Sequence, residues 1–284
     1  MKILVLGARG QAGHTISLYM AERGNDVTGF DRTATTLVRP VVGDARDTDL
    51  VRDLIIKGGF DVVINCIGIL NQFAENDKAL AAFLNGYFPH FLADITKDLD
   101  TKIIHMSTDC VFSGQHGGYT ETSLRDGTSF YDRSKALGEL EDEKNVTLRN
   151  SVVGPDMNPS GIGLLNWFMQ QQGQVHGFRK AMWTGLTTLE LAKAMEQAAE
   201  QKAHGLYNIV YAQPISKYDL LCLFNKHLRR HPVELLPADG SPSDKSLVRT
   251  RFDFAYEVPD YETMVAELGV WMQAHKDLYP HYDL

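Results

Sequence analysis

Short apolar runs alternate with stretches of helical periodicity along the first half of the chain. The run Lys2–Leu6 stops at Gly7, and the following stretch, Gln11–Arg23, spaces its apolar residues three or four positions apart. Short, unbroken apolar runs are typical of strands buried on both faces of a parallel sheet. Further strands are expected at Asp26–Phe30, Pro40–Gly43, Asp61–Cys66, Lys102–Met106 and Val146–Arg149, helices at Thr48–Lys57 and Asn76–Lys97, and part of another helix at Ser134–Asp142. This alternation predicts a doubly wound parallel α/β sheet of the Rossmann type.

The pattern of strands and helices becomes less regular after about residue 150. A passage rich in glycine and proline, 154–163, precedes an amphipathic stretch at Leu164–Gln172. One more strand is expected at Gly205–Val210, and two more helices at Ser216–Leu228 and Thr263–His275. We therefore expect a sheet domain over 1–150, to which later segments at about 184–211 return, and a smaller lobe formed mainly by 151–284.

Composition narrows the class of protein. The chain has 284 residues, of which 44% are hydrophobic and 23% charged, an ordinary globular balance. A net charge of -8 without a basic run argues against nucleic acid or an anionic membrane as the main partner. The three cysteines are odd in number and far apart, so neither a disulfide framework nor a metal site is expected. With no secretory or membrane-spanning segment visible, we expect a cytoplasmic protein.

Three glycines follow the first predicted strand. Gly7, Gly10 and Gly13 stand three residues apart, and Gln11 opens the predicted helix. Glycines there allow a sharp turn and let a pyrophosphate approach the amide groups of the helix N-terminus. A purely structural turn is the alternative, but the position at the start of a βαβαβ series favours a dinucleotide-binding domain over 1–150.

The residues after the next strands leave the cofactor open between NADP and NAD. Asp31 ends the second strand, where an acid can bind the adenosine ribose. Arg32 and Arg9 could instead hold a 2′-phosphate, and two arginines against one acid favour NADP. The other predicted cofactor contacts are Gln11 at the glycine turn, Asp44 and Ala45 after the third strand, and Cys66, Ile67 and Gly68 after the fourth.

A tyrosine and a lysine follow at a spacing of one helical turn. Tyr131 and Lys135 would project from one helix face, where an ammonium group can lower the pKa of the phenol toward the operating pH. Such a phenol exchanges a proton with a carbonyl/alcohol pair. Ser107 and Thr108 end the fifth strand and would bring a hydroxyl to the same oxygen, although they could simply cap the strand.

Together these motifs resemble an extended short-chain dehydrogenase/reductase, and most of all the dTDP-4-dehydrorhamnose reductase group. The resemblance rests on the GxxGxxG turn, Asp44, Asn65–Gly68, Ser107–Phe112, Tyr119–Thr122 and Tyr131–Lys135. It implies a nucleotide-sugar lobe over 151–284 and hydride transfer from NAD(P)H to a nucleotide-linked keto sugar, as in the synthesis of surface polysaccharide precursors. It also implies that Thr108, Tyr131 and Lys135 are the catalytic residues and that Ser107, Tyr131 and Lys135 contact the cofactor.

Two alternatives stay open beside the reductase. Sugar dehydratases of this superfamily usually carry Asp-Glu after the threonine, whereas Asp109 is followed here by Cys110, which favours reduction over elimination. An epimerase shares the tyrosine and the lysine. A non-catalytic NADP-binding regulatory subunit shares the fold, although it would have no chemical need for all three catalytic groups.

The predicted substrate contacts are less specific. They are Thr108, Asp109, Val111, Phe178 and Trp183. Phe178 or Trp183 could stack on a base, with Arg179 or Lys180 at a phosphate, but burial of Trp183 in the core is an equal alternative. His275 and His281, near the C-terminal end of the sequence, form no ligand spacing with a carboxylate, so no metal is expected. Surface helices could pair two copies into a homodimer.

Overall fold

A seven-stranded, fully parallel sheet forms the centre of the structure, a computed structural model that describes residues 1–284. The strand order is β3-β2-β1-β4-β5-β6-β11, which reverses direction between β1 and β4. The strands are β1 (Lys2–Leu6), β2 (Asp26–Asp31), β3 (Arg39–Val42), β4 (Val62–Asn65), β5 (Lys102–Ser107), β6 (Val146–Arg149) and β11 (Gly205–Asn208). The predicted doubly wound, Rossmann-type sheet is therefore confirmed.

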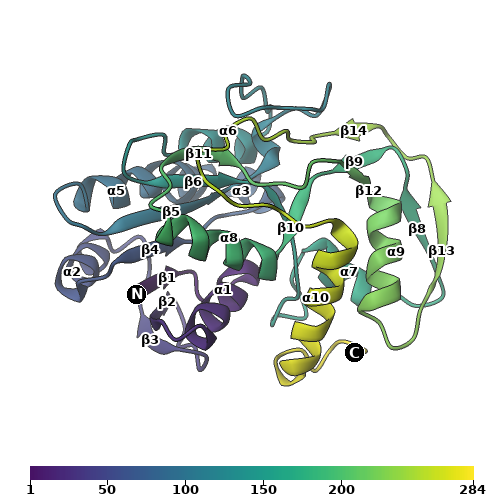
Figure 1. The fold of residues 1–284 in the computed structure, drawn as a ribbon, viewed down its shortest axis with the longest axis horizontal. Helices are drawn as coiled ribbons and strands as arrows, with labels where there is room; N and C mark the ends of the chain where they lie inside the picture. The colour runs from purple at the N-terminus through teal and green to yellow at the C-terminus, as the bar shows by residue number, and fades with distance from the viewer.

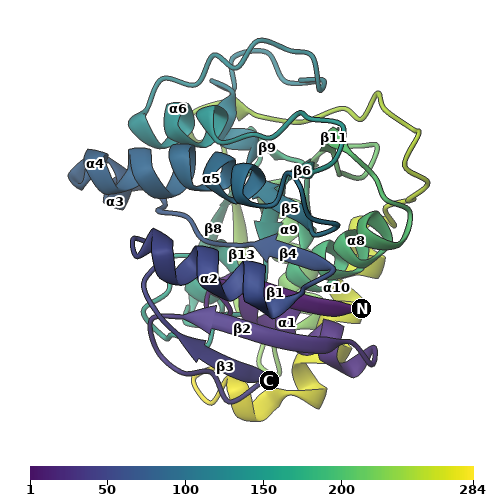
Figure 2. The same cartoon turned by 90° about the vertical axis from the view of Figure 1, so that its left-hand side faces the viewer.

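Helices cover both faces of this sheet. Figure 1 shows α1 and α8 side by side on one face, and Figure 2 shows α2 and α5 on the other. The helices around the sheet are α1 (Gln11–Glu22), α2 (Thr48–Gly58), α3 (Asn71–Asn76), α4 (Lys78–Ala81), α5 (Phe88–Ile95), α6 (Phe130–Leu137) and α8 (Thr188–Glu200). The apolar side chains of the strands point alternately to these two layers and form a core on each side.

A smaller lobe lies beside the carboxyl edge of the sheet, at the right of Figure 1. Its helices are α7 (Leu164–Met169), α9 (Lys217–His227) and α10 (Tyr261–Ala274). Its short strands are β7 (Ser151–Val153), β8 (Gln174–Phe178), β9 (Ala181–Trp183), β10 (Gly185–Thr187), β12 (Ile215–Ser216), β13 (Glu234–Ala238) and β14 (Ser243–Asp244). The core of this lobe is continuous with the layer formed by α1 and α8. The division into two lobes at residue 150 stays a prediction. None of the helices is both long enough and apolar enough to cross a lipid bilayer.

Two helices differ most from their predicted bounds. Helix α6 begins at Phe130 because Ser129 and Asp132 form a reciprocal capping box, and it ends before Gly138, where a Cβ would lie 1.9 Å from the Asn85 carbonyl oxygen. The long helix predicted over Asn76–Lys97 is interrupted. Asp77 caps a new start, and a π-helical turn (η1, Ala82–Tyr87) precedes α5. Such π-helical insertions often occur near functional sites.

Candidate active site

The glycine turn joins β1 to α1 without any room for side chains. Gly7 has a φ of +79°, a conformation that favours glycine, and a Cβ on Gly13 would lie 2.0 Å from the Gly7 carbonyl oxygen. Helix α1 can therefore start directly on the turn. Its N-cap is Gly10, which offers no side chain to the free amide groups of the first turn. These amides and the helix dipole form an anion-binding site.

A cavity of about 400 Å³ opens beside this turn, at the point where the strand order reverses. Nine of the predicted cofactor residues line it: Gly7, Gly10, Asp31, Arg32, Asp44, Ala45, Cys66, Ile67 and Gly68. It is the part of the site that could hold an adenosine.

The Asp31 carboxylate also holds the turn in place. It accepts hydrogen bonds from the backbone amides of Arg9, at 3.0 Å, and Arg32, at 2.7 Å. The side chain of Arg9 does not line the cavity. The carboxylate of Asp44 pairs with Arg46, a lining residue that sequence analysis missed, and the guanidinium group holds the pKa of that carboxyl below its usual range.

A second cavity of about 340 Å³ continues from the first. Both are lined by Gly10, Cys66, Ile67 and Gly68, so they form one groove along the carboxyl ends of the strands. The second cavity contains the predicted residues Gln11, Ser107, Thr108, Asp109, Tyr131 and Lys135, and also Met106, Asn150, Ser151, Val152 and Leu164. We call it the reaction cavity. It brings the three predicted catalytic side chains together.

The titrating groups of the reaction cavity are buried. Burial lowers the pKa of Lys135 to about 8, although the nearby Glu139 carboxylate raises it, and the ammonium group donates to the Met106 carbonyl oxygen at 2.8 Å. Burial raises the pKa of Tyr131, and the neighbouring Thr108 hydroxyl opposes the rise. Lys135 was expected to lower the pKa of Tyr131, but in this structure the pKa is raised. The reason is that burial of the phenol has a larger effect than the groups that favour its ionised form. A phenol that keeps its proton suits the role of an acid.

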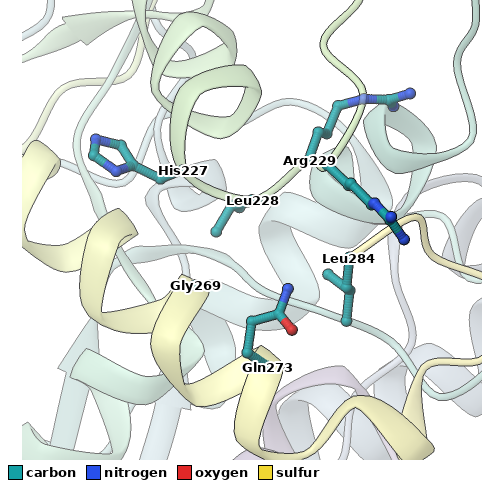
Figure 3. A pocket seen from close by; sticks show the side chains of 7 residues that line it. His227, Leu228, Arg229, Gly269, Gln273 and Leu284 are labelled. Carbon is teal, nitrogen blue, oxygen red and sulfur yellow. The ribbon is translucent and has the colours of Figure 1, made fainter.

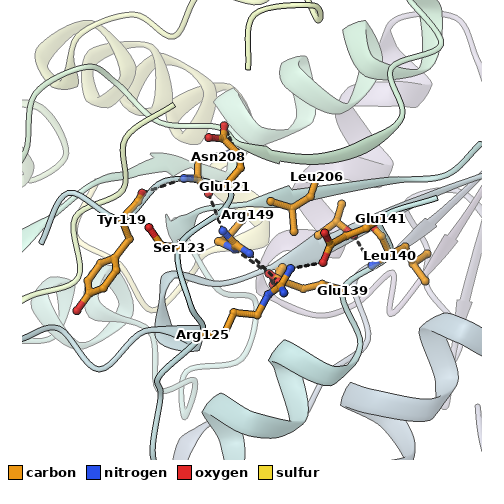
Figure 4. Close-up of polar contacts among 12 residues, drawn as sticks. Tyr119, Glu121, Ser123, Arg125, Glu139, Leu140, Glu141, Arg149, Leu206 and Asn208 are labelled. Atoms are coloured by element: carbon orange, nitrogen blue, oxygen red, sulfur yellow. Dashed lines mark hydrogen bonds and ion pairs between the residues drawn. The ribbon is translucent and has the colours of Figure 1, made fainter. Parts of the chain in front are cut away.

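Glu139 connects the elements that carry these groups, as Figure 4 shows in part. It lies just after the end of α6, four residues beyond Lys135, and its carboxylate accepts hydrogen bonds from the Ser107 hydroxyl, at 2.6 Å, and from Arg149, at 2.7 and 2.8 Å. Arg125 pairs with the same carboxylate. Glu139 and Arg149 are both fully buried side chains. Burial alone would raise the pKa of Glu139, but Arg149 and Arg125 outweigh it and keep the pKa low.

Asn85, on the π-helical turn, supports the other wall. Its side-chain amide donates to the Ile69 carbonyl oxygen and to the Ser134 hydroxyl, at 2.9 and 3.0 Å, and accepts from the Ile69 amide at 2.8 Å. It thereby ties the loop after Gly68 to helix α6. An asparagine next to a glycine within an apolar helical stretch was the signal available in the sequence, and sequence analysis did not use it.

Four other predicted residues lie outside the linings of both cavities. Gly13 packs on the turn, and Val111 is buried beneath the site. Trp183 is 5% exposed and packs on Tyr261, whereas Phe178 is 47% exposed on β8. The structure favours the core interpretation of Trp183, and binding of a base by either aromatic residue stays a prediction.

A separate cavity of about 350 Å³ lies between the ends of α9 and α10 (Figure 3). It is lined by His227, Leu228, Arg229, Gly269 and Gln273, among others. The guanidinium group of Arg229 is engaged by backbone carbonyl oxygens at the end of α7. None of these residues lines the groove of the candidate active site. No group of three or more His, Cys, Asp or Glu side chains is arranged to hold a metal ion.

The fold and the groove define a Rossmann-type α/β protein in which a glycine turn leads to a Thr/Tyr/Lys group whose tyrosine and lysine are buried. Residues 1–252 match the family described as the RmlD substrate binding domain, and the chain belongs to that family. A dTDP-4-dehydrorhamnose reductase of Mycobacterium tuberculosis is 31% identical over 144 residues, which are 49% of this chain and 44% of that protein. The match thus spans less than half of that relative's length.

Solved structures show the same fold at low sequence identity. A dTDP-4-dehydrorhamnose reductase of Bacillus anthracis, in complex with NADP, superimposes with a TM-score of 0.80 at 17% identity and covers 95% of this chain and 99% of its own. A UDP-glucose 4-epimerase of Thermotoga maritima gives 0.76 at 17% identity and covers 97% and 100%. Reductases and epimerases are therefore alike in fold, and only the site can separate them.

Proposed function

We propose that the protein is an NADPH-dependent reductase of a nucleotide-linked keto sugar, similar to dTDP-4-dehydrorhamnose reductase. The observation that carries the proposal is the convergence of Thr108, Tyr131 and Lys135 on one cavity that continues into the glycine-turn cavity. The name of the Mycobacterium tuberculosis relative supports the same activity.

The residues present fit a nicotinamide dinucleotide. A Cβ on Gly13 would collide with the turn, and the first-turn amides of α1 are free for a pyrophosphate. Arg32 lines the adenosine end, where a 2′-phosphate would find a positive charge, and the NADP named for the Bacillus anthracis structure agrees with this preference. NAD remains the alternative cofactor.

The chain's own groups then have separate tasks. The bound nicotinamide would supply the hydride, which is chemistry that no side chain can provide. The Tyr131 phenol keeps its proton in the buried site and gives it to the carbonyl oxygen as that oxygen becomes an alcohol. The Thr108 hydroxyl stabilises the developing negative charge, and the Lys135 ammonium group lends positive potential to the same place.

The test follows the absorbance of NADPH at 340 nm with a panel of nucleotide-linked 4-keto sugars. Tyr131→Phe should lower kcat by about 10²- to 10⁴-fold, since it removes only the acidic proton. Tyr87→Phe, at an exposed position on η1, is the matched control and should leave kcat unchanged. Sugar-dependent oxidation of the cofactor that survives in Tyr131→Phe would contradict the proposed acid.

Two results would favour the alternatives. Interconversion of a sugar without net cofactor oxidation would support an epimerase, a class with the same fold. Tight NADPH binding without turnover of any sugar would support a regulatory subunit. We also propose a homodimer and a cytoplasmic location. The location is proposed because the three cysteines are all unpaired, as is usual for proteins of a reducing compartment.

A further inference from the structure

The Thr108 hydroxyl, which the proposed function needs as a hydrogen-bond donor, already gives its proton to a neighbour. Thr108 is the N-cap of the short 3₁₀ turn η2 (Asp109–Val111), and its Oγ1 accepts a hydrogen bond from the Cys110 amide at 3.1 Å. The hydroxyl donates to Asp109 Oδ1, also at 3.1 Å. A hydroxyl can donate only once but can accept twice. While Asp109 is the acceptor, Thr108 has no proton left for a keto oxygen.

The same two oxygens can form a hydrogen bond in the opposite direction. If the Asp109 carboxyl group carries a proton, it donates to Thr108 Oγ1 at the acceptor site that the Cys110 amide leaves free. Both acceptor sites of the hydroxyl are then occupied, and its proton is free to bond to a ligand in the reaction cavity, which Thr108 lines. The protonation state of Asp109 therefore decides whether Thr108 can donate to a ligand.

The charge of Asp109 leads to the same conclusion. The carbonyl oxygen of a keto sugar gains negative charge as it is reduced, and Thr108 is expected to stabilise that charge. Asp109 is bonded directly to Thr108 and is only 7% exposed, so an ionised carboxylate there would repel the developing charge with little screening by water. A neutral carboxyl group would not oppose the reaction.

The surroundings of Asp109 favour the neutral form. Burial raises the pKa of its carboxyl group, whereas the charges of Lys245, which follows β14, and Lys217, on α9, lower it. Hydrogen bonds from Thr108 and Cys110 also lower it, but burial has the largest effect and the pKa is raised overall. The two lysines act through their charge alone and not through a hydrogen bond.

The other titrating groups near Asp109 do not favour its ionised form. Burial raises the pKa of Tyr131, on α6, and of Cys110, and a charge on Asp109 raises both further. Asp132, also on α6, is a second acid that acts on the same two groups in the same direction. These neighbours supply no positive charge, so only the two lysines oppose the effect of burial.

We propose that Asp109 is a positioning residue that works as a neutral acid: its O–H donates to Thr108 Oγ1 and thereby leaves the Thr108 proton for the carbonyl oxygen of the keto sugar. This inference rests on the proposed function. Asp109 keeps its own proton throughout, because Tyr131 supplies the proton of the new alcohol and the nicotinamide supplies the hydride. Asp109 needs no contact with the sugar for this role.

Infrared difference spectroscopy tests the protonation state without any sugar or turnover. The spectrum of the wild-type protein minus that of Asp109→Asn should contain the C=O stretch of a protonated carboxyl group at pH 7. Asp98→Asn, at an exposed position after α5, is the matched control. Its difference spectrum should contain only the bands of an ionised carboxylate, because an exposed aspartate has a pKa of about 3.9.

Reduction of the keto sugar tests whether Asp109 acts through Thr108. Asp109→Ala should lower kcat about tenfold and change KM less than twofold, and Asp109→Asn should restore most of the loss, because its amide N–H can donate to the same oxygen. In a Thr108→Val background, Asp109→Ala should lower kcat no further, since the hydroxyl that Asp109 orients is gone. Melting temperatures report folding, and Asp109→Leu replaces the alanine variant if that one does not fold.

Four results would overturn the inference. Absence of the protonated carboxyl band at pH 7 would mean that Asp109 is ionised. An Asp109→Asn variant no faster than Asp109→Ala would mean that no donor is needed there. Equal losses from Asp109→Ala with and without the Thr108 hydroxyl would mean that Asp109 does not act through Thr108. A raised KM with unchanged kcat would assign Asp109 to sugar binding instead.

Failure of the proposed function is distinguishable from these results. Lack of turnover with every keto sugar would be seen in the wild-type protein, before any substitution is made. The infrared measurement needs no turnover, so it determines the protonation state of Asp109 in either case.

Discussion

The buried pair of Glu139 and Arg149 gives the sharpest prediction about stability. Glu139→Gln preserves the shape of the side chain and removes its charge, which leaves the fully buried Arg149 guanidinium group without a counter-charge. Breaking one partner of a buried pair costs about 3–5 kcal/mol. The remaining contacts of Arg149, to Asn208 and over the Phe112 ring, involve no opposite charge and cannot replace it.

Thermal and urea unfolding measure this loss. At about 2 °C per kcal/mol for a chain of this size, Glu139→Gln should lower Tm by roughly 6–10 °C. Asp53→Asn breaks the exposed pair with Lys57 on α2 and should cost only about 0.5 kcal/mol. The double variant Glu139→Gln/Arg149→Met should be more stable than the sum of the single losses predicts, because it removes both charges. Additive losses in that cycle would refute the ion-pair argument.

The same pair predicts two pH effects. The folded-state pKa of Glu139 is lowered, so its contribution to stability is present above its unfolded pKa of about 4.3 and is lost as the pH falls through the folded value. Wild-type stability should therefore fall more steeply on acidification than that of Glu139→Gln. Glu139 also raises the pKa of Lys135, so the alkaline limb of kcat/KM, near pH 8, should move to lower pH in the variant. A limb that stays in place would show that Glu139 is structural only and does not act through Lys135.

Two further substitutions test the cofactor end of the groove. Gly13→Ala should prevent α1 from packing on the glycine turn and abolish cofactor binding, since its Cβ would lie 2.0 Å from the Gly7 carbonyl oxygen. Arg32→Ala should weaken NADPH by about tenfold and NADH by less than twofold, because only NADPH carries the phosphate that a guanidinium group binds. Arg52→Ala, in an exposed pair on α2, should change neither affinity, and equal loss of both cofactors in Arg32→Ala would contradict a role at the 2′-phosphate.

The sheet could be predicted because its signals are local. Each inner strand is an apolar run that stops at a glycine or a polar residue, and the residues at those stops, from Gly7 to Thr108, are the ones that line the groove. Sequence analysis placed Tyr131 and Lys135 on one helix but did not locate the start of α6. The capping box of Ser129 and Asp132 that sets this start is visible in the sequence, but the apolar positions there are sparse. Local signals thus locate the strand ends better than the helix ends.

Contacts that join distant segments could not be predicted in this way. Arg46 was missed because a charged residue in a loop is ordinarily solvated. Its pair with Asp44 is local, but only the fold places both residues in the cavity wall, opposite segments that are distant in the sequence. Trp183 is the opposite case, because its sequence neighbourhood suggests a ligand contact and the fold buries the side chain instead. An aromatic residue near two cations suggests a ligand contact, but the packing of β9 against α10 buries it, and no local pattern distinguishes the two cases.

The polar groups at the carboxyl edge of β5, β6 and β11 explain why one acceptor stands apart. Ser107, Glu139, Arg149 and Asn208 satisfy one another across the three strands, so burial there is matched by hydrogen bonds and opposite charges. Asn150 follows directly on this network, but its buried Oδ1 has no hydrogen-bond partner in it. A buried acceptor without a partner costs free energy, so this position is less favourable for folding than the matched groups beside it.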